Sequence, residues 1–178
     1  MRTTNPNVLR RQRGAFAIEL AMVLVIFLGI YLFMTDISHK ILVRAQLDRT
    51  SFALANILKE RSRFYGERQT LNDNDRDDMV ALASRLLERD SNAVAIKIEA
   101  LHDSLTMETY TSDRFNTLGC QSTDINQKTN LVPVEDGKIY SLYQVTLCEQ
   151  RDSWFANFWG DSGTPTFTLT SSSVVPGR

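Results

Sequence analysis

Residues 15–34 read AFAIELAMVLVIFLGIYLFM, an apolar stretch of 20 residues in which Glu19 carries the only charge. A helix of this length would be roughly 30 Å long, because each residue adds about 1.5 Å, and this matches the hydrocarbon core of a bilayer. A buried helix of a soluble protein is the alternative, but such a helix rarely keeps large apolar side chains on every face. The stretch therefore predicts a transmembrane helix.

The charges on the two sides of this stretch differ. Four arginines and no acidic residue precede it, whereas residues 35–178 have a net charge of −4, although the whole chain has a formal net charge of only −1. Because basic residues flank the cytoplasmic end of a membrane span, we expect a single pass with the N-terminus in the cytoplasm and residues 35–178 in a periplasm or its equivalent. The residues after Met34 offer no pair of small residues for a signal peptidase, so the helix is expected to remain attached.

The residues that lead into the apolar stretch form a recognisable junction. The sequence RQRG at 11–14 is followed by AFAIE at 15–19 and then by the unbroken apolar run. This order resembles the leader junction of type IV prepilins. The longer pattern GAFAIELAMVL is similar to the TadE/TadF minor pseudopilins of the Tad (Flp) pilus, with TadF more similar in size and layout. Leu20 stands where major Flp pilins usually carry tyrosine, which favours an accessory subunit.

The resemblance implies a function and a set of partners. In that family a membrane prepilin peptidase cuts after the glycine, here Gly14, so that residues 1–14 are a cleaved cytoplasmic leader, Ala15 is the new N-terminus and Glu19 is the fifth residue. It implies a minor pilin of the bacterial inner membrane that helps initiate or assemble a Tad pilus for surface adherence and is itself a candidate for incorporation into the pilus. The implied partners are the prepilin peptidase, the inner-membrane pilus platform and other pilin-like subunits. No cofactor is implied, since a separate ATPase would supply the energy.

Glu19 has a physical interpretation that does not need the resemblance. An ionisable group inside a membrane segment costs a few kcal/mol and by default suggests a function. Cutting after Gly14 would create an ammonium group at Ala15, which a carboxylate on a neighbouring helix, offset by about one turn, would neutralise. This pairing would fix the stagger between subunits, so we hypothesise that Glu19 sets the register of assembly. The alternative is that Glu19, about 6 Å along the helix from Ala15, simply leans towards the headgroups.

The helix is expected to continue beyond the membrane, from residue 15 to about residue 63, because no proline or glycine occurs between Ile30 and Tyr65. Two apolar stripes in its rear half suggest packing on more than one side: Ile37, Ile41, Ala45, Phe52 and Ala55 in one, and Leu47, Leu54, Ile57 and Leu58 in the other. We therefore expect residues 15–34 in the membrane, residues 35–64 as the continuation of the helix, and residues 65–178 as a periplasmic globular head.

The head shows one helical pattern followed by alternating ones. A second helix is expected over about 75–89, with N-cap candidates at 72–75. The acidic run there does not match a calcium loop, because Asp78 and Ser84 stand where glycine and glutamate are needed, so no metal is expected. Four strands are expected at 93–101, 105–110, 138–149 and 166–175, with 112–130 as a loop. The predicted fold is α+β and pilin-like, with an antiparallel sheet of about four strands on the long helix.

The chain has two cysteines, Cys120 and Cys148. In an extracytoplasmic domain we expect them to form a disulfide, and two buried thiols or a reactive pair are the alternatives.

Four aromatic residues lie close together near the end of the chain. Their i, i+1, i+4, i+5 spacing would give a short helix one aromatic face: Trp154, Phe155, Phe158 and Trp159. Packing in the core or as a lid on the sheet is the first expectation. The second is an interface with a neighbouring subunit, because tryptophan is favoured in such contacts.

Other functional classes find little support. The net charge of −1 argues against nucleic-acid binding. We find no phosphate-binding loop, nucleophile elbow or HExxH motif, so an enzyme is not expected. Two alternatives remain: an uncleaved, signal-anchored periplasmic binding or sensing domain, and a pseudopilin of a type II secretion system.

Overall fold

The computed structural model describes residues 6–64, 70–102, 106–135, 137–160, 163 and 165–177, and within these ranges it describes all side chains except those of 6–14, 61–64 and 138. The chain divides into two compact units. Residues 1–39 and 152–165 form one, here called the anchor unit, and residues 40–151 and 166–178 form the other, here called the sheet unit. The first helix contributes residues to both units.

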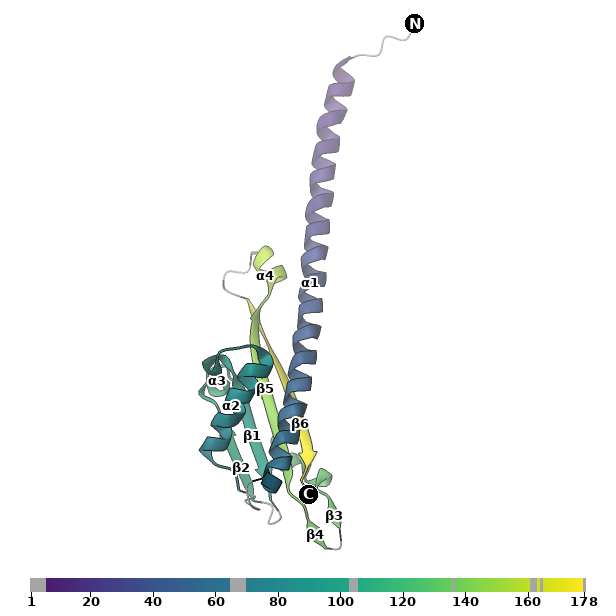
Figure 1. Cartoon of the computed structure of the whole chain (residues 1–178). Coiled ribbons are helices and arrows are strands. Elements are labelled where there is room, and N and C mark those ends of the chain that lie inside the picture. The colour runs from purple at the N-terminus through teal and green to yellow at the C-terminus, as the bar shows by residue number, and fades with distance from the viewer. Residues whose placement is uncertain are drawn as a thin grey trace. The chain divides into compact units, whose positions relative to one another are not determined.

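This helix, α1, spans Pro6–Phe64 without interruption (Figure 1). The long helix predicted from the sequence is confirmed, but it begins before the expected start at Ala15. Pro6 suits the first helical position, where the missing N–H is not needed, and Gly14 within the helix costs only about 1 kcal/mol. The predicted end at about residue 63 agrees with the observed end at Phe64, and residues 65–69 after it lie outside the described residues.

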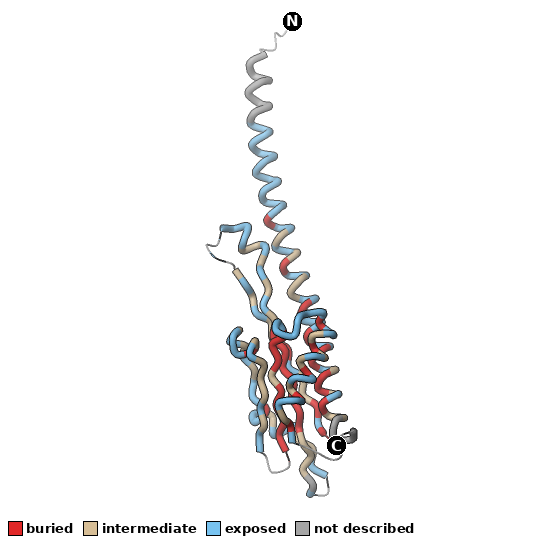
Figure 2. Tube along the Cα trace, turned by 60° about the vertical axis from the view of Figure 1, so that its left-hand side comes forward, coloured by how far each residue is buried: buried red, intermediate tan, exposed pale blue. Residues whose placement is uncertain are grey.

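The main hydrophobic core lies in the sheet unit, where α1 and the second helix cover one face of the sheet (Figure 2). From α1 it contains Leu47, Leu54 and Leu58, each at most 1% exposed. These residues belong to one of the two predicted stripes. The other stripe is mostly uncovered, since Ile41 and Phe52 are 62% and 58% exposed, although its Ala55 is buried in the same core. The predicted packing of both stripes is therefore only partly confirmed, because Ile57 of the Leu47 stripe is also 43% exposed.

The second helix, α2, spans Asp73–Leu87 and begins slightly earlier than expected. A capping box explains its start. The Asn72 side chain accepts from the Asp75 N–H at 2.9 Å, and the Asp75 carboxylate accepts from the Asn72 N–H at 2.8 Å. Met79, Ala83 and Leu87 form its buried face against the core.

The sheet has four strands, as the sequence predicted, and their order is β2-β1-β5-β6 (Figure 1). They span Ala95–Leu101 (β1), Met107–Thr111 (β2), Leu142–Asp152 (β5) and Thr166–Pro176 (β6). Both β2 and β5 pair antiparallel with β1. The sequence predicts a hairpin turn at residues 102–104 between β1 and β2, and residues 103–105 lie outside the described residues.

The strand expected over 138–149 is divided in the structure. Lys138–Ile139 forms β4, which pairs with β3 (Val134–Glu135), and β5 begins only at Leu142. The cause is that the intervening backbone bonds elsewhere. The Tyr140 N–H donates to the Pro133 carbonyl, beside the β3–β4 pair. The clearest strand of the sequence therefore starts later, and ends later, than its pattern suggests.

The segment 112–130, expected to be a loop, covers the other face of the sheet. It contains a short helix α3 (Asp113–Thr117) and a 3₁₀ segment η2 (Ile125–Leu131), and another 3₁₀ turn, η1 (Ser91–Ala93), precedes β1. Two apolar residues fix it in place, because Phe115 is 5% and Ile125 is 0% exposed. The polar composition of the segment concealed these two contacts. We call residues 112–131 the cover segment.

Candidate functional site

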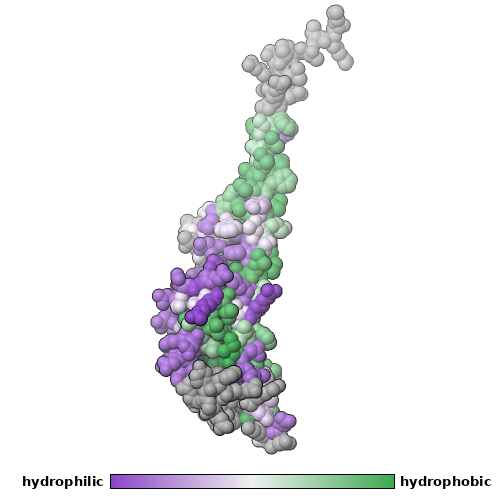
Figure 3. Space-filling view, in the orientation of Figure 1, coloured by the Kyte–Doolittle hydropathy of each residue, from purple (hydrophilic) through white to green (hydrophobic). Residues whose placement is uncertain are grey.

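The apolar part of α1 exposes its side chains. Apart from the half-buried Leu32, the large apolar residues between Phe16 and Met34 leave between 45% and 66% of their surface exposed, and Figure 3 shows apolar side chains covering the visible face of this stretch. By length and composition α1 can cross a membrane, because its part Ala15–Glu60 contains an 18-residue window with a mean hydropathy of 2.5. An apolar surface of this extent marks contact with lipid or with other helices.

Glu19 projects from this apolar surface and is exposed. Among the residues that the structure describes, none is joined to Glu19 by a hydrogen bond or an ion pair. Ala15 is also exposed, and Gly14 lies within the helical backbone, but its surroundings lie outside the described residues. The carboxylate is therefore available to a group outside the described part of the chain.

A second feature of the anchor unit is the aromatic segment, which forms a short helix α4 (Trp154–Phe158). Asp36 of α1, only 5% exposed, holds the start of this helix. Its carboxylate accepts from the Ser153 hydroxyl at 2.5 Å, from the Trp154 N–H at 3.1 Å and from the Phe155 N–H at 3.2 Å. Hydrogen bonds to a charged group are worth about 1.5–3 kcal/mol each, so Asp36 fixes α4 beside α1.

The aromatic side chains of α4 pack along α1. The Phe155 ring meets Phe33 edge-on at 5.4 Å between centroids, and Trp154 stacks on His39 at 5.8 Å. At the other end of α4, a Cβ placed on Gly29 would lie 3.8 Å from the Trp159 ring.

The expectation of core packing is wrong for these residues, whereas a lid on the sheet would join the two units and stays a prediction. None of the α4 residues is buried, and Trp159 is 72% exposed. The physical reason is that a helix of this length has one covered side, and its partner here is α1 within the anchor unit. Whether the exposed side meets a neighbouring subunit stays a prediction.

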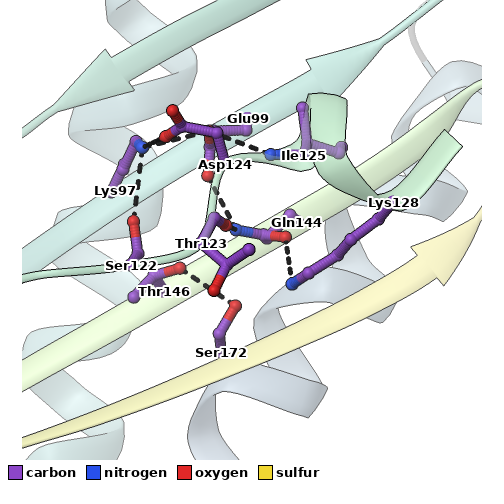
Figure 4. A network of polar contacts seen from close by, with 10 residues as sticks. All are labelled: Lys97, Glu99, Ser122, Thr123, Asp124, Ile125, Lys128, Gln144, Thr146 and Ser172. Carbon is purple, nitrogen blue, oxygen red and sulfur yellow. Dashed lines mark hydrogen bonds and ion pairs between the residues drawn. The ribbon is translucent and has the colours of Figure 1, made fainter.

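The sheet unit contains a buried polar network beneath the cover segment (Figure 4). Glu99 of β1 is 0% exposed, and its carboxylate accepts from Lys97 at 3.0 Å, from Gln144 at 2.7 Å and from the Ile125 N–H at 3.4 Å. Gln144 connects Glu99 to Lys128, because its amide oxygen accepts a hydrogen bond from the Lys128 ammonium group at 2.6 Å. Every oxygen of the buried acid thus has a donor, which is the condition for burying a charge at tolerable cost.

Two lysines respond oppositely to this network. Burial by itself would lower the pKa of Lys97, but its hydrogen bonds to Asp124 and Glu99 and their negative charges outweigh this and raise the pKa. For Lys128, burial lowers the pKa, and the charge of Glu99 offsets only part of the effect. Lys97 is therefore the direct cationic partner of Glu99, and Lys128 contacts it through Gln144.

The two cysteines form the disulfide Cys120–Cys148, as expected. Cys148 on β5 is 4% exposed and packs with Ala95 of β1 and Phe115 of the cover segment. The bond therefore ties the cover segment to the central strand pair, beside the polar network. Within the described residues, no group of three His, Cys, Asp or Glu side chains is placed to hold a metal ion.

Comparison with known families accounts for nearly the whole chain. The family model TadF, described as "Putative tight adherence pilin protein F", matches residues 7–178. The chain belongs to the TadF family. Neither the curated proteins nor the solved structures compared with the chain give a match. The match includes the N-terminal helix, both units and the disulfide, so all the features described above belong to the TadF region.

Membership of the TadF family gives the structural features a common setting. TadF is a pilin of the Tad pilus, and pilins are structural proteins that associate with the membrane and with other pilus components. The apolar helix of this TadF protein is accordingly its single-pass membrane anchor. The resemblance seen at residues 11–34 is thereby confirmed at the level of the family.

Sequence reasoning missed two residues of this TadF protein that organise its surface and its interior. Asp36 gave no signal, because its partner Ser153 is 117 positions away, although serine before Trp154 is itself an N-cap signal. In the alternating pattern of β1, Glu99 lies on the other face of the sheet from Ile96 and Ile98. No signal in the neighbouring sequence indicated that another segment covers this face. Apolar residues on that same face, Leu101 and Leu142, were the available hint.

Proposed function

We propose that this TadF-family pilin is made as a prepilin, is cut after Gly14 by a prepilin peptidase, and then helps to initiate or assemble the Tad pilus for surface adherence. The N-terminus before the cut is cytoplasmic, and the sheet unit is periplasmic, with α1 crossing the inner membrane. The subunit acts through binding and is not an enzyme. Its partners are the peptidase, the inner-membrane pilus platform and other pilin-like subunits.

The observation that carries the proposal is Glu19, an acidic residue without a partner among the described residues, on an exposed apolar helix that belongs to a pilin family. Cutting after Gly14 would remove the four leader arginines and leave an ammonium group at Ala15. Two opposite unit charges 4 Å apart attract by about 4 kcal/mol at an effective dielectric of 20. An ammonium group on one subunit and Glu19 on the next therefore favour one stagger of the two helices.

Changing Glu19 to alanine or to glutamine is expected to reduce incorporation into assemblies with other pilin-like subunits by about tenfold or more, because every 1.4 kcal/mol of lost pairing is a factor of ten. The glutamine variant keeps the shape and removes only the charge. Incorporation is measured as the fraction of tagged subunit that co-purifies with other pilin subunits from cross-linked membranes, at matched expression.

The matched control is Glu19→Asp, which keeps the charge on a shorter side chain and should retain part of the incorporation. All three variants should still be cut after Gly14, as judged by a change in mass. Incorporation of Glu19→Ala at the level of the unsubstituted chain would show that Glu19 is only a tolerated residue near the headgroups.

A further inference from the structure

We propose that the α4 segment is a second membrane contact, which docks into the interfacial region of the bilayer at the end of the α1 span, with Trp159 and Phe158 facing the lipid. The occupant of the exposed side of α4 is thus the lipid surface itself. The inference rests on the role of α1 as membrane anchor and goes beyond the assembly function of Glu19.

The level of α4 along α1 is the first argument. A Cβ on Gly29 would lie 3.8 Å from Trp159 and 4.0 Å from Phe158, so both rings lie beside Gly29. Gly29 precedes Met34, the last residue of the apolar stretch, by five positions, which is about 7.5 Å of helix. If residues 15–34 fill the hydrocarbon core, these two rings are at the depth where interfacial side chains reside, about 5–10 Å below the polar boundary.

The opposite end of α4 lies at the other side of the same boundary. Trp154 stacks on His39, which is five positions beyond Met34. Between the two ends, Asp36 lies two positions past the apolar stretch and accepts the hydrogen bonds of the α4 start. The start of α4, which Asp36 holds, is therefore in the headgroup region. Its end, with Phe158 and Trp159, points towards the acyl chains.

The chemistry of the exposed side is the second argument. Trp159 is 72% and Phe158 is 38% exposed, and tryptophan is enriched at membrane interfaces because its ring is apolar and its N–H is not. At the end of α4 that faces the acyl chains, the backbone N–H of Trp159 donates to the Phe155 carbonyl and that of Gly160 to the Asn157 carbonyl, so this end approaches lipid without these donors left bare. A neighbouring subunit could cover the same rings only by displacing the lipid that surrounds Gly29.

Depth-dependent quenching of tryptophan fluorescence tests the proposal on the full chain, which contains two tryptophans. The variant Trp154→Phe leaves Trp159 as the only emitter, and the matched variant Trp159→Phe leaves Trp154. Each is reconstituted in vesicles of phosphatidylethanolamine and phosphatidylglycerol that carry a quencher near the headgroup or deep in the acyl chain. We expect Trp159 to be quenched more by the shallow than by the deep label and to be protected from acrylamide in the water. Trp154 should be quenched less by both labels.

A third variant shows whether the span itself is inserted. Leu24→Trp, in a chain whose two native tryptophans are phenylalanine, places the only emitter in the middle of the apolar stretch and should be quenched most by the deep label. If Trp159 is open to acrylamide while the residue 24 reporter is quenched, the α4 proposal fails and the anchor stands. If the tryptophan at residue 24 is not quenched either, both the α4 proposal and the membrane insertion of α1 are contradicted. Protection of Trp159 that appears only at high protein density identifies a neighbouring subunit as the occupant and also overturns the proposal.

Discussion

Replacing Glu99 with alanine is expected to destabilise the sheet unit by about 3–5 kcal/mol, the usual cost of breaking a buried ion pair from one side. The substitution removes the acceptor for three donors, the side chains of Lys97 and Gln144 and the backbone N–H of Ile125. Lys97 would remain with 12% of its side chain exposed, beside a cavity where its buried partner had been. Because total stabilities are about 5–15 kcal/mol, this loss alone approaches the limit of folding.

Urea unfolding of the full chain in detergent micelles, followed by circular dichroism, measures this change in the free energy of unfolding. The matched control is Asp124→Ala, because Asp124 binds the same Lys97 at 2.7 Å but is 54% exposed. Exposed ion pairs contribute about 0–1 kcal/mol, so the control should lose little. Equal losses from the two variants would contradict the view that the network stabilises the sheet unit because Glu99 is buried.

Removing the disulfide is expected to cost about 3.5 kcal/mol, the second large effect. The bond joins residues 28 positions apart, and in the chain-entropy model a loop of this length restricts the unfolded chain by that amount. Without the bond, Phe115 and Ile125 are the main apolar contacts that hold the cover segment on the sheet. We therefore expect this segment to detach before the rest of the unit unfolds.

Two versions of the experiment separate the covalent link from packing. Reduction of the unsubstituted chain breaks the link and keeps both sulfur atoms, whereas the double variant Cys120→Ala with Cys148→Ala also leaves a space near Ala95. Reduction should account for most of the loss, and amide hydrogen exchange should rise first in residues 112–131. A reduced chain as stable as the oxidised one, with unchanged exchange in this segment, would contradict the tethering role.

Local patterns predicted most of the fold. The apolar run at 15–34, the uninterrupted helix after it and the alternation in β1 and β6 are signals that lie within one element, and each is confirmed. The start of β5 was misplaced because the Tyr140 N–H bonds to the Pro133 carbonyl, beside the β3–β4 pair, and does not join the main sheet. Such choices depend on segments outside the strand itself.

The candidate site was predictable only in part for the same reason. Glu19 is an acid in an apolar run, and Cys120 and Cys148 are the two cysteines, so both features were visible in the sequence. The burial of Glu99 follows only from the cover segment, which looked polar. The position of α4 follows from Asp36, whose role depends on contacts with Ser153 and the residues after it. Composition identified the short aromatic helix but gave no partner for it.

The N-terminal residue of the protein purified from the membranes of its own host tests the central claim most directly. Sequencing or intact mass distinguishes a processed pilin from an uncleaved, signal-anchored domain, because the two differ by residues 1–14 and their four arginines. We predict a chain that begins at Ala15. A chain that begins at Met1 or Arg2 would contradict the proposed processing, and with it the pairing of a new N-terminus with Glu19.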